Sequence, residues 1–167
     1  MGKYSFDDFR KVRLFQDLTD KQIELVSLLL EPLHITKGQY IIKEQTLGDH
    51  IFILMDGTVR VTKELVKGVD DQETGEKTLA TITSALFPTF GETGLLGESL
   101  RSANVIAVSD CQLYTLSQKD FDHFTKDNPE IALKIMRNIA SVLSDRLIDT
   151  DENLVKLATA LYISVSR

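Results

Sequence analysis

The 167-residue sequence predicts a fold of mixed α and β structure, mainly β, in which short antiparallel strands form a sandwich or roll between two helical ends. Three observations lead to this prediction. Residues 33–116 contain short runs rich in β-branched and aromatic residues, separated by turn sequences such as DG and ETGE. Residues 4–31 have the apolar spacing of helices. No proline or glycine follows Pro129 as far as Arg167, which favours one long C-terminal helix.

Composition and charge exclude several classes of protein. The net charge of −6 disfavours broad binding to DNA or to an anionic membrane, because phosphate contacts need a basic surface. The single cysteine, Cys111, excludes an internal disulfide and a cysteine-rich zinc site. The N-terminus lacks the apolar core of a signal peptide, and no stretch approaches the length of a membrane span. We therefore expect a cytoplasmic protein that does not contact membranes.

Capping signals mark the helical ends of the chain. In LTDKQIELVSLLL, Thr19 is a good N-cap and Gln22 completes a capping box. Ser117 is placed to cap a short helix that follows the last strand. Pro129 suits the first turn of the long helix, which could reach roughly 50 Å at about 1.5 Å per residue.

The strands are expected in the runs QYIIKE, HIFILMDGTVRVTKEL, KTLATIT and CQLYTL. The acidic segment GVDDQETGEK between two of them is most simply a solvated hairpin connection. Neither this loop nor the scattered histidines His34, His50 and His123 form a pattern typical of a metal site.

Two apolar stripes run along the predicted C-terminal helix. One follows the alternating spacing of a coiled-coil seam and contains Leu133, Met136, Ala140, Leu143, Leu147, Thr150, Leu154, Leu157 and Leu161. The other lies beside its first half and contains Ile131, Ile135, Ile139 and Val142. One stripe can pack on the strands while the other meets a partner helix. The alternative is a single wide face that packs on the core.

The stretch FGETGLLGESLRSANVIA, residues 90–107, has the residue types of a site for a small anionic ligand. Its glycines allow a close backbone approach, and a short helix from Glu92 to about Leu96 would add aligned N–H donors. Arg101 offers a fixed fork of donors to phosphate oxygens, and Ser102 offers one more. Glu92 only accepts hydrogen bonds, so it suits a ribose 2′-hydroxyl. One arginine balances one negative charge, which favours a phosphodiester. An ordinary hairpin with a surface Glu–Arg pair is the alternative.

The same stretch resembles the phosphate-binding cassette of the cyclic nucleotide-binding domain family. The matching residues are Phe90, Gly91, Glu92, Gly94, Leu95, Leu96, Arg101 and Ala103. The similarity continues over nearly the whole chain and implies an eight-stranded antiparallel β-roll (jelly roll) with N-terminal helices and a long C-terminal helix. It also implies a division into a ligand-binding β-roll domain with flanking helices, 1–125, and a dimerisation and signalling helix, 126–167. We call residues 90–103 the cassette.

The resemblance assigns roles to individual residues. It implies that Glu92 binds the ribose 2′-hydroxyl, that Arg101 binds the cyclic phosphate and that Ser102 donates to the phosphate. The full expected ligand-binding set is Gly91, Glu92, Thr93, Gly94, Leu95, Arg101, Ser102, Ala103 and Arg146. The chain departs from the family pattern at Gln45, Leu100 and Asn104, and its approach to the cassette, SALFPTFGE, is longer than usual. None of these departures removes a ligand-contacting group.

Arg146 enters this set by its position on the long helix. A count from the triplet Arg101–Ala103, which catabolite activator-like members of the family share, places Arg146 and Leu147 over the base. A guanidinium stacks on a purine and donates to guanine O6 or N7, so we expect weak discrimination between cAMP and cGMP. The alternative is a solvated arginine paired with Asp149 or Asp145.

The expected function is that of a non-catalytic cyclic nucleotide sensor. The ligand is expected to be cAMP, with cGMP as the alternative, and no metal or other cofactor is expected. We expect a homodimer through the C-terminal helix, an unknown effector protein, and no DNA binding by this chain alone, because no helix-turn-helix follows the long helix. The alternatives are a degenerate domain that has lost its ligand, or the sensor half of a longer transcription regulator. A cupin-type enzyme and a haem sensor are less consistent with the histidine pattern.

Overall fold

The computed structural model describes residues 4–64, 76–97 and 99–165. The chain begins with three short helical elements, α1 (Phe6–Lys11), η1 (Arg13–Phe15) and α2 (Asp20–Ser27). The predicted capping box of α2 is present: the Thr19 side chain accepts from the Gln22 amide, and the Gln22 side chain accepts from the Thr19 amide. The first strand begins at Glu31, so the helical region ends before residue 31.

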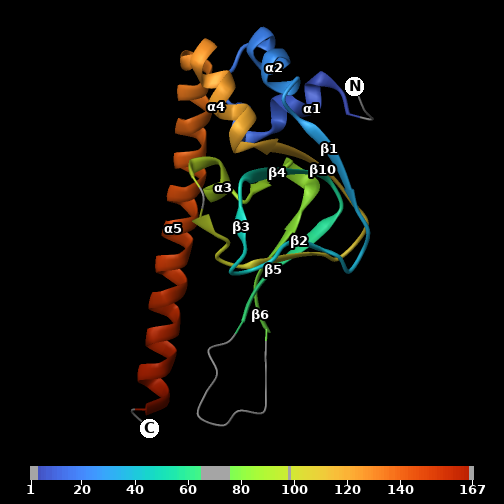
Figure 1. The fold of residues 1–167 in the computed structure, drawn as a ribbon. Helices are drawn as coiled ribbons and strands as arrows, with labels where there is room; N and C mark the ends of the chain where they lie inside the picture. Colours follow the sequence, from blue (N-terminus) through green and yellow to red (C-terminus); the bar gives the residue numbers. More distant parts are fainter. Residues whose placement is uncertain (1–3, 65–75, 98, 166–167) are drawn as a thin grey trace.

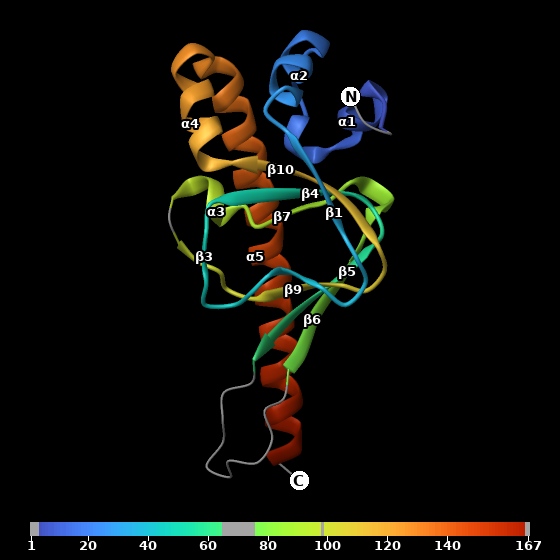
Figure 2. The same ribbon diagram turned by 45° about the vertical axis from the view of Figure 1, so that its right-hand side comes forward.

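The strands form two four-stranded antiparallel sheets and one short pair (Figure 2). The first sheet has the order β1 (Glu31–Ile35), β10 (Cys111–Ser117), β4 (His50–Asp56), β7 (Thr89–Phe90). The second has the order β2 (Tyr40–Ile42), β9 (Asn104–Ala107), β5 (Thr58–Glu64), β6 (Glu76–Thr83). The pair consists of β3 (Leu47–Gly48) and β8 (Ser99–Leu100), and η2 (Ser84–Leu86) precedes β7. The two main sheets give the expected jelly-roll fold, and the β3–β8 pair is the addition to the expected eight strands.

The turn Asp56–Gly57 joins β4 to β5, as the DG sequence predicted. Gly57 has a φ of +99°, and a Cβ there would lie 2.5 Å from the Asp110 carbonyl oxygen. Glycine is therefore required on both conformational and steric grounds. The other predicted connection is the acidic segment GVDDQETGEK, residues 68–77, between β5 and β6. Its residues 68–75 lie outside the described residues, and its last two residues begin β6.

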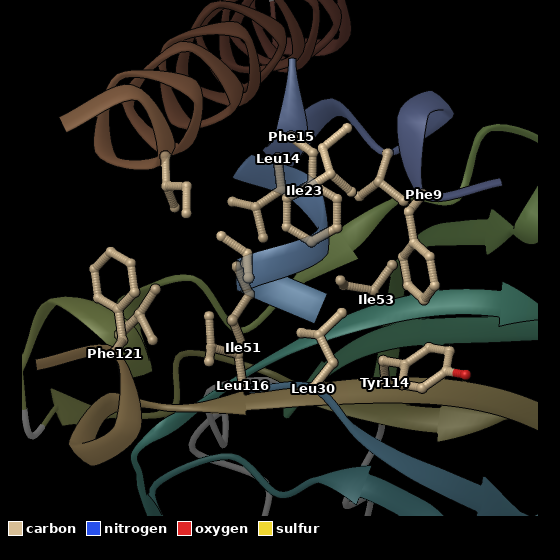
Figure 3. Close-up of a cluster of buried hydrophobic side chains, with 14 of the residues drawn as sticks. Phe9, Leu14, Phe15, Ile23, Leu30, Ile51, Ile53, Tyr114, Leu116 and Phe121 are labelled. Atoms are coloured by element: carbon tan, nitrogen blue, oxygen red, sulfur yellow. The ribbon is translucent and has the colours of Figure 1, made fainter. Parts of the chain in front are cut away.

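Two hydrophobic clusters hold the fold together. The larger joins the N-terminal helices, the outer side of the first sheet and the C-terminal helices, and includes Phe9, Phe15, Ile53, Leu116 and Phe121 (Figure 3). The smaller fills the space between the two main sheets and includes Phe52, Leu54, Val59 and Phe90. The larger cluster fixes the helices relative to the roll.

Two helices follow the roll: α4 (Gln118–Asp127) and α5 (Pro129–Val165). Ser117 caps α4 by accepting from the Asp120 amide, and α5 begins at Pro129, as the sequence predicted. α5 runs along one side of the roll and continues past the two main sheets (Figure 1). The break between the helices falls at Asn128; the division of the chain into a sensor part and a helix part stays a prediction. None of the helices within the described ranges has the length and apolar content that a membrane crossing needs.

The two stripes of α5 have different environments. Ile131, Ile135, Ile139 and Val142 are buried in the chain. Most leucines of the seam are exposed, including Leu133, Leu147, Leu154, Leu157 and Leu161, whereas Met136 and Leu143 pack partly against the core. The alternative of a single wide core face is therefore wrong.

Candidate functional site

Apart from residue 98, the cassette runs from the end of β7 through the helix α3 (Thr93–Leu96) and the strand β8 to position 103. β7 leads into the four-residue helix α3 (Thr93–Leu96), where the sequence predicted a short helix. The chain then returns through β8, and Arg101 continues the pairing of β8 with the β3 region: its amide donates to the Thr46 carbonyl, and its carbonyl accepts from the Gln45 amide. These backbone bonds fix the point from which the Arg101 side chain enters the site.

The Arg101 side chain is buried and points into the cassette. Only 5% of the residue is exposed. Nη1 donates to the Gly91 carbonyl at 2.9 Å, and Nη2 donates to the His50 carbonyl at 2.7 Å. Burial lowers the pKa of Arg101, while the negative charges of Asp49 and Glu92 oppose that change. No carboxylate of the described residues lies within ion-pair distance of this guanidinium, so its hydrogen-bond partners there are backbone carbonyls.

Three glycines surround the Arg101 guanidinium. A Cβ at Gly48 would lie 1.9 Å from Nε. A Cβ at Gly94 would lie 2.8 Å from Nη2, and one at Gly91, where φ is +77°, would lie 2.9 Å from Nη1. Because side chains cannot occupy these positions without displacing the guanidinium, the glycines form a cradle for it. We call Gly48, Gly91 and Gly94 the glycine cradle.

Glu92 is the second buried charge of the site. Glu92 is 3% exposed and directly precedes α3. Oε1 accepts from the Thr89 hydroxyl at 3.1 Å, and Oε2 accepts from Arg146 Nη1 at 2.8 Å. Both oxygens of this carboxylate therefore have a donor.

Arg146 reaches the site from α5, as expected, but by a contact that was not expected. Its guanidinium pairs with Glu92 and donates to the Thr89 carbonyl at 2.6 Å. The expected alternative, a solvated arginine paired with Asp145 or Asp149, is wrong, because within the described residues the ion pair of Arg146 is with Glu92, while Asp145 pairs with Arg13. The stacking of Arg146 on a base stays a prediction.

The other expected site residues differ in their exposure. Leu95 and Gly94 are buried, Ala103 is half-buried, and Thr93 and Ser102 are exposed. The amides of Gly94 and Leu95 donate to the carbonyls of Gly91 and Glu92. These two N–H groups, which the sequence analysis offered to a phosphate, are thus used inside the cassette.

Sequence reasoning missed Thr89 and the backbone of His50. Thr89 is buried and contacts both Glu92 and Arg146, and the His50 carbonyl accepts from Arg101. A carbonyl contact leaves no mark on the side chain of its residue. The glycine of the LGD sequence at Gly48 is the one signal that a close approach occurs there.

The residues considered for metal or haem binding have ordinary contacts. His34 bonds to Gln112, and His50 bonds to Asp49. Cys111 is a buried free thiol, and burial raises its pKa. In the described part of the chain, no group of three metal-ligating side chains could hold an ion.

Comparison with known proteins agrees with this geometry. Residues 32–128, more than half of the chain, match the family model of the cyclic nucleotide-binding domain. The chain is 39% identical over 105 residues to the cGMP-dependent protein kinase, isozyme 2 forms cD5/T2, of Drosophila melanogaster, a match that covers 62% of this chain and 10% of the kinase. It is 40% identical over 101 residues to Glutaminase 1 of Bradyrhizobium diazoefficiens, covering 60% of this chain and 14% of the glutaminase.

Solved structures of a catabolite activator protein and of a PKA regulatory domain are also similar to this chain. The catabolite activator protein of Thermus thermophilus is 27% identical with a TM-score of 0.71, over 87% of this chain and 63% of that one. The regulatory domain of Toxoplasma gondii PKA, solved with cAMP, is 26% identical with a TM-score of 0.59, over 74% of this chain and 44% of that one. The chain spans only a small part, 10% and 14%, of the length of the kinase and the glutaminase named above. It belongs to the cyclic nucleotide-binding domain family.

Proposed function

We propose that this chain is a non-catalytic, cytoplasmic sensor that binds cAMP at the cassette and transmits occupancy through α5. The observation that supports this proposal most is the buried Arg101 guanidinium. A cation that is only 5% exposed and bonds to two carbonyls keeps its full positive charge in a place shielded from water. Such a charge is stabilised by an anion that can enter the cassette.

The hydrogen-bonding capacity of Arg101 fits a phosphate. A guanidinium has five N–H donors, and Arg101 donates to the carbonyls of Gly91 and His50. The remaining N–H groups suit the oxygens of a singly charged cyclic phosphate. Glu92, nine residues before Arg101 in the cassette, accepts hydrogen bonds only and suits the ribose 2′-hydroxyl. Ser102 is exposed beside Arg101 and is free to turn its hydroxyl to the same phosphate.

The choice between cAMP and cGMP depends on the base. The PKA regulatory domain named above was solved with cAMP, whereas the Drosophila kinase is cGMP-dependent. We propose cAMP as the ligand. Weak discrimination against cGMP would require Arg146 to face the base with its donors. This guanidinium pairs with Glu92 instead, so stacking on the base is the alternative role for Arg146.

The exposed seam of α5 supports a homodimer. Leu147 is 62% exposed, and Leu154, Leu157 and Leu161 are exposed to a similar degree. Their spacing matches a coiled coil, in which a second copy of the same helix covers each leucine. We propose that this helix pair carries the response to an effector protein.

The test is calorimetric titration of the protein with cAMP, cGMP and a cyclic dinucleotide. We expect cAMP to bind with one site per chain, and Arg101→Ala to remove the binding. Arg137→Ala, which changes an exposed arginine of α5, is the matched control and should bind as the parent does. If no nucleotide binds to the folded parent, the proposed function is wrong and the chain is a ligand-free interaction domain.

A further inference from the structure

Two hydrogen bonds connect Arg146 of α5 to the cassette residue Glu92 and to Thr89, the residue just before the cassette. Arg146 Nη1 donates to Glu92 Oε2 at 2.8 Å, and Arg146 Nη2 donates to the Thr89 carbonyl at 2.6 Å. The partners are separated by more than fifty residues in sequence, so the contact depends on how α5 lies against the roll. Glu92 is also the carboxylate to which we assign the ribose 2′-hydroxyl.

Arg146 lies just beyond the part of α5 that packs against the roll. The buried residues of α5 end at Val142. Beyond Arg146, the hydrogen bonds and ion pairs of α5 that join described residues all stay within the helix. Arg146 therefore makes the last polar attachment of α5 to the roll, just before the exposed half of the seam.

The same turn of α5 has a second attachment on another side. Arg13 of η1 pairs with Asp145 and donates to the Ser141 hydroxyl at 2.9 Å. This attachment involves no cassette residue. α5 is thus held near residue 145 by two ion pairs, and only one of them uses a group of the proposed ligand site.

The two partners of Glu92 differ in how readily they can leave. Thr89 is buried, whereas the Arg146 side chain is 43% exposed. A half-exposed guanidinium regains water when its ion pair breaks, which lowers the cost on the arginine side, whereas the buried carboxylate needs a replacement donor. A hydroxyl donor that approaches the buried carboxylate can take the place of Arg146 on Oε2 while Thr89 stays on Oε1.

We propose that the ligand 2′-hydroxyl and Arg146 compete for Glu92, so that ribose binding detaches α5 from the cassette at Arg146. The proposal rests on the proposed function, because it needs a ribose at Glu92. It identifies Arg146 as the residue that couples ligand occupancy to the helix, and it gives the 2′-hydroxyl the role of the trigger. Arg146 is a positioning residue in this account.

The competition is tested by titrating three proteins with cAMP and with 2′-deoxy-cAMP. The proteins are the parent, Arg146→Gln, and Arg13→Gln as the matched control that breaks the other attachment of the same turn. We expect Arg146→Gln to bind cAMP several-fold more tightly than the parent does, because the hydroxyl no longer displaces a guanidinium. Its affinity for 2′-deoxy-cAMP should be unchanged, and Arg13→Gln should match the parent with both ligands.

Other outcomes overturn the proposal in separate ways. A weaker or unchanged affinity of Arg146→Gln for cAMP means that Arg146 does not compete, and weaker binding of both ligands is the result expected for stacking on the base. Tighter binding of both ligands by both variants means that loosening the helix, rather than freeing Glu92, is responsible. If the parent binds neither nucleotide, the proposed function itself fails, and the competition fails with it.

Discussion

The cassette and the C-terminal half of α5 place their residues in opposite environments. In the cassette, two charged side chains, Arg101 and Glu92, are almost fully buried. Along residues 143–165 of α5, large apolar side chains such as Leu147 and Leu161 are exposed to water. Buried charges require partners of opposite charge or well-placed hydrogen bonds, and exposed apolar stripes require an apolar partner.

The proposed function gives the two regions different tasks. At the cassette, the glycine cradle, the β3–β8 pair and the carbonyls of Gly91 and His50 all position one guanidinium. The C-terminal half of α5 has few contacts with the roll. Among the described residues, its last polar contact with the roll is the one between Arg146 and Glu92. In the proposed function, a ligand bound at the cassette changes how α5 is held at Arg146. Four substitutions test this contrast.

Arg101→Ala should have the largest effect. Hydrogen bonds to charged groups are worth about 1.5–3 kcal/mol each, so the loss of two such bonds to a phosphate weakens cAMP binding by about 3–6 kcal/mol. This corresponds to at least about a hundredfold in the dissociation constant, which calorimetry measures. Arg101→Lys keeps the charge without the fork and should fall between parent and alanine variant. If Arg101→Ala binds cAMP as tightly as the parent does, the cassette is not the phosphate-binding site.

Leu147→Glu should separate the dimer. Each chain would then place a carboxylate in the helix contact, and an unpaired buried ion costs several kcal/mol. Light scattering should show a dimeric parent and a folded, monomeric variant. Lys156→Glu also adds negative charge to exposed α5, outside the seam, and should remain dimeric. A parent that is monomeric at micromolar concentration would contradict the proposed role of the seam.

Glu92→Ala should weaken cAMP binding less than Arg101→Ala does, because one hydrogen bond to a charged group is lost, worth about 1.5–3 kcal/mol. The variant should also bind cAMP and 2′-deoxy-cAMP with the same affinity. Parallel titrations of the two ligands measure this ratio. If the variant still prefers the ribose ligand, another residue binds the 2′-hydroxyl.

Gly48→Ala should affect binding through sterics alone. The added methyl group would lie 1.9 Å from Arg101 Nε and displace the guanidinium, and such overpacking costs about 1–3 kcal/mol. Gly38→Ala is the matched control: its φ of +86° makes the change unfavourable, but no atom lies within 4 Å of the new methyl group. Urea unfolding should show that both variants are destabilised, while titration should show that only Gly48→Ala loses affinity for cAMP.

Local signals in the sequence predicted the parts of the fold that depend on neighbouring residues. The Thr19–Gln22 capping box, the Ser117 cap and Pro129 at the start of α5 each act within one turn. The two-residue strands β3, β7 and β8 are too short to leave a pattern of alternation, and they form because longer neighbours position them.

The sequence predicted which residues lie in the cassette better than it predicted which atoms they contact. Gly91, Glu92 and Arg101 lie within eleven residues of chain, and the Arg101 side chain reaches back to the Gly91 carbonyl. The pairing of Glu92 with Arg146 could not be predicted, because it depends on the rotation of α5 against the roll. The carbonyls that hold Arg101 could not be predicted either, since any residue type provides a carbonyl.

The most direct test of the central claim is a crystal structure of the protein with cAMP bound. We expect the cyclic phosphate within hydrogen-bond distance of the Arg101 guanidinium, at the glycine cradle, and the ribose 2′-hydroxyl on Glu92 in place of Arg146. A nucleotide bound elsewhere, or a phosphate that does not contact Arg101, would contradict the assignment of the cassette as the sensor site.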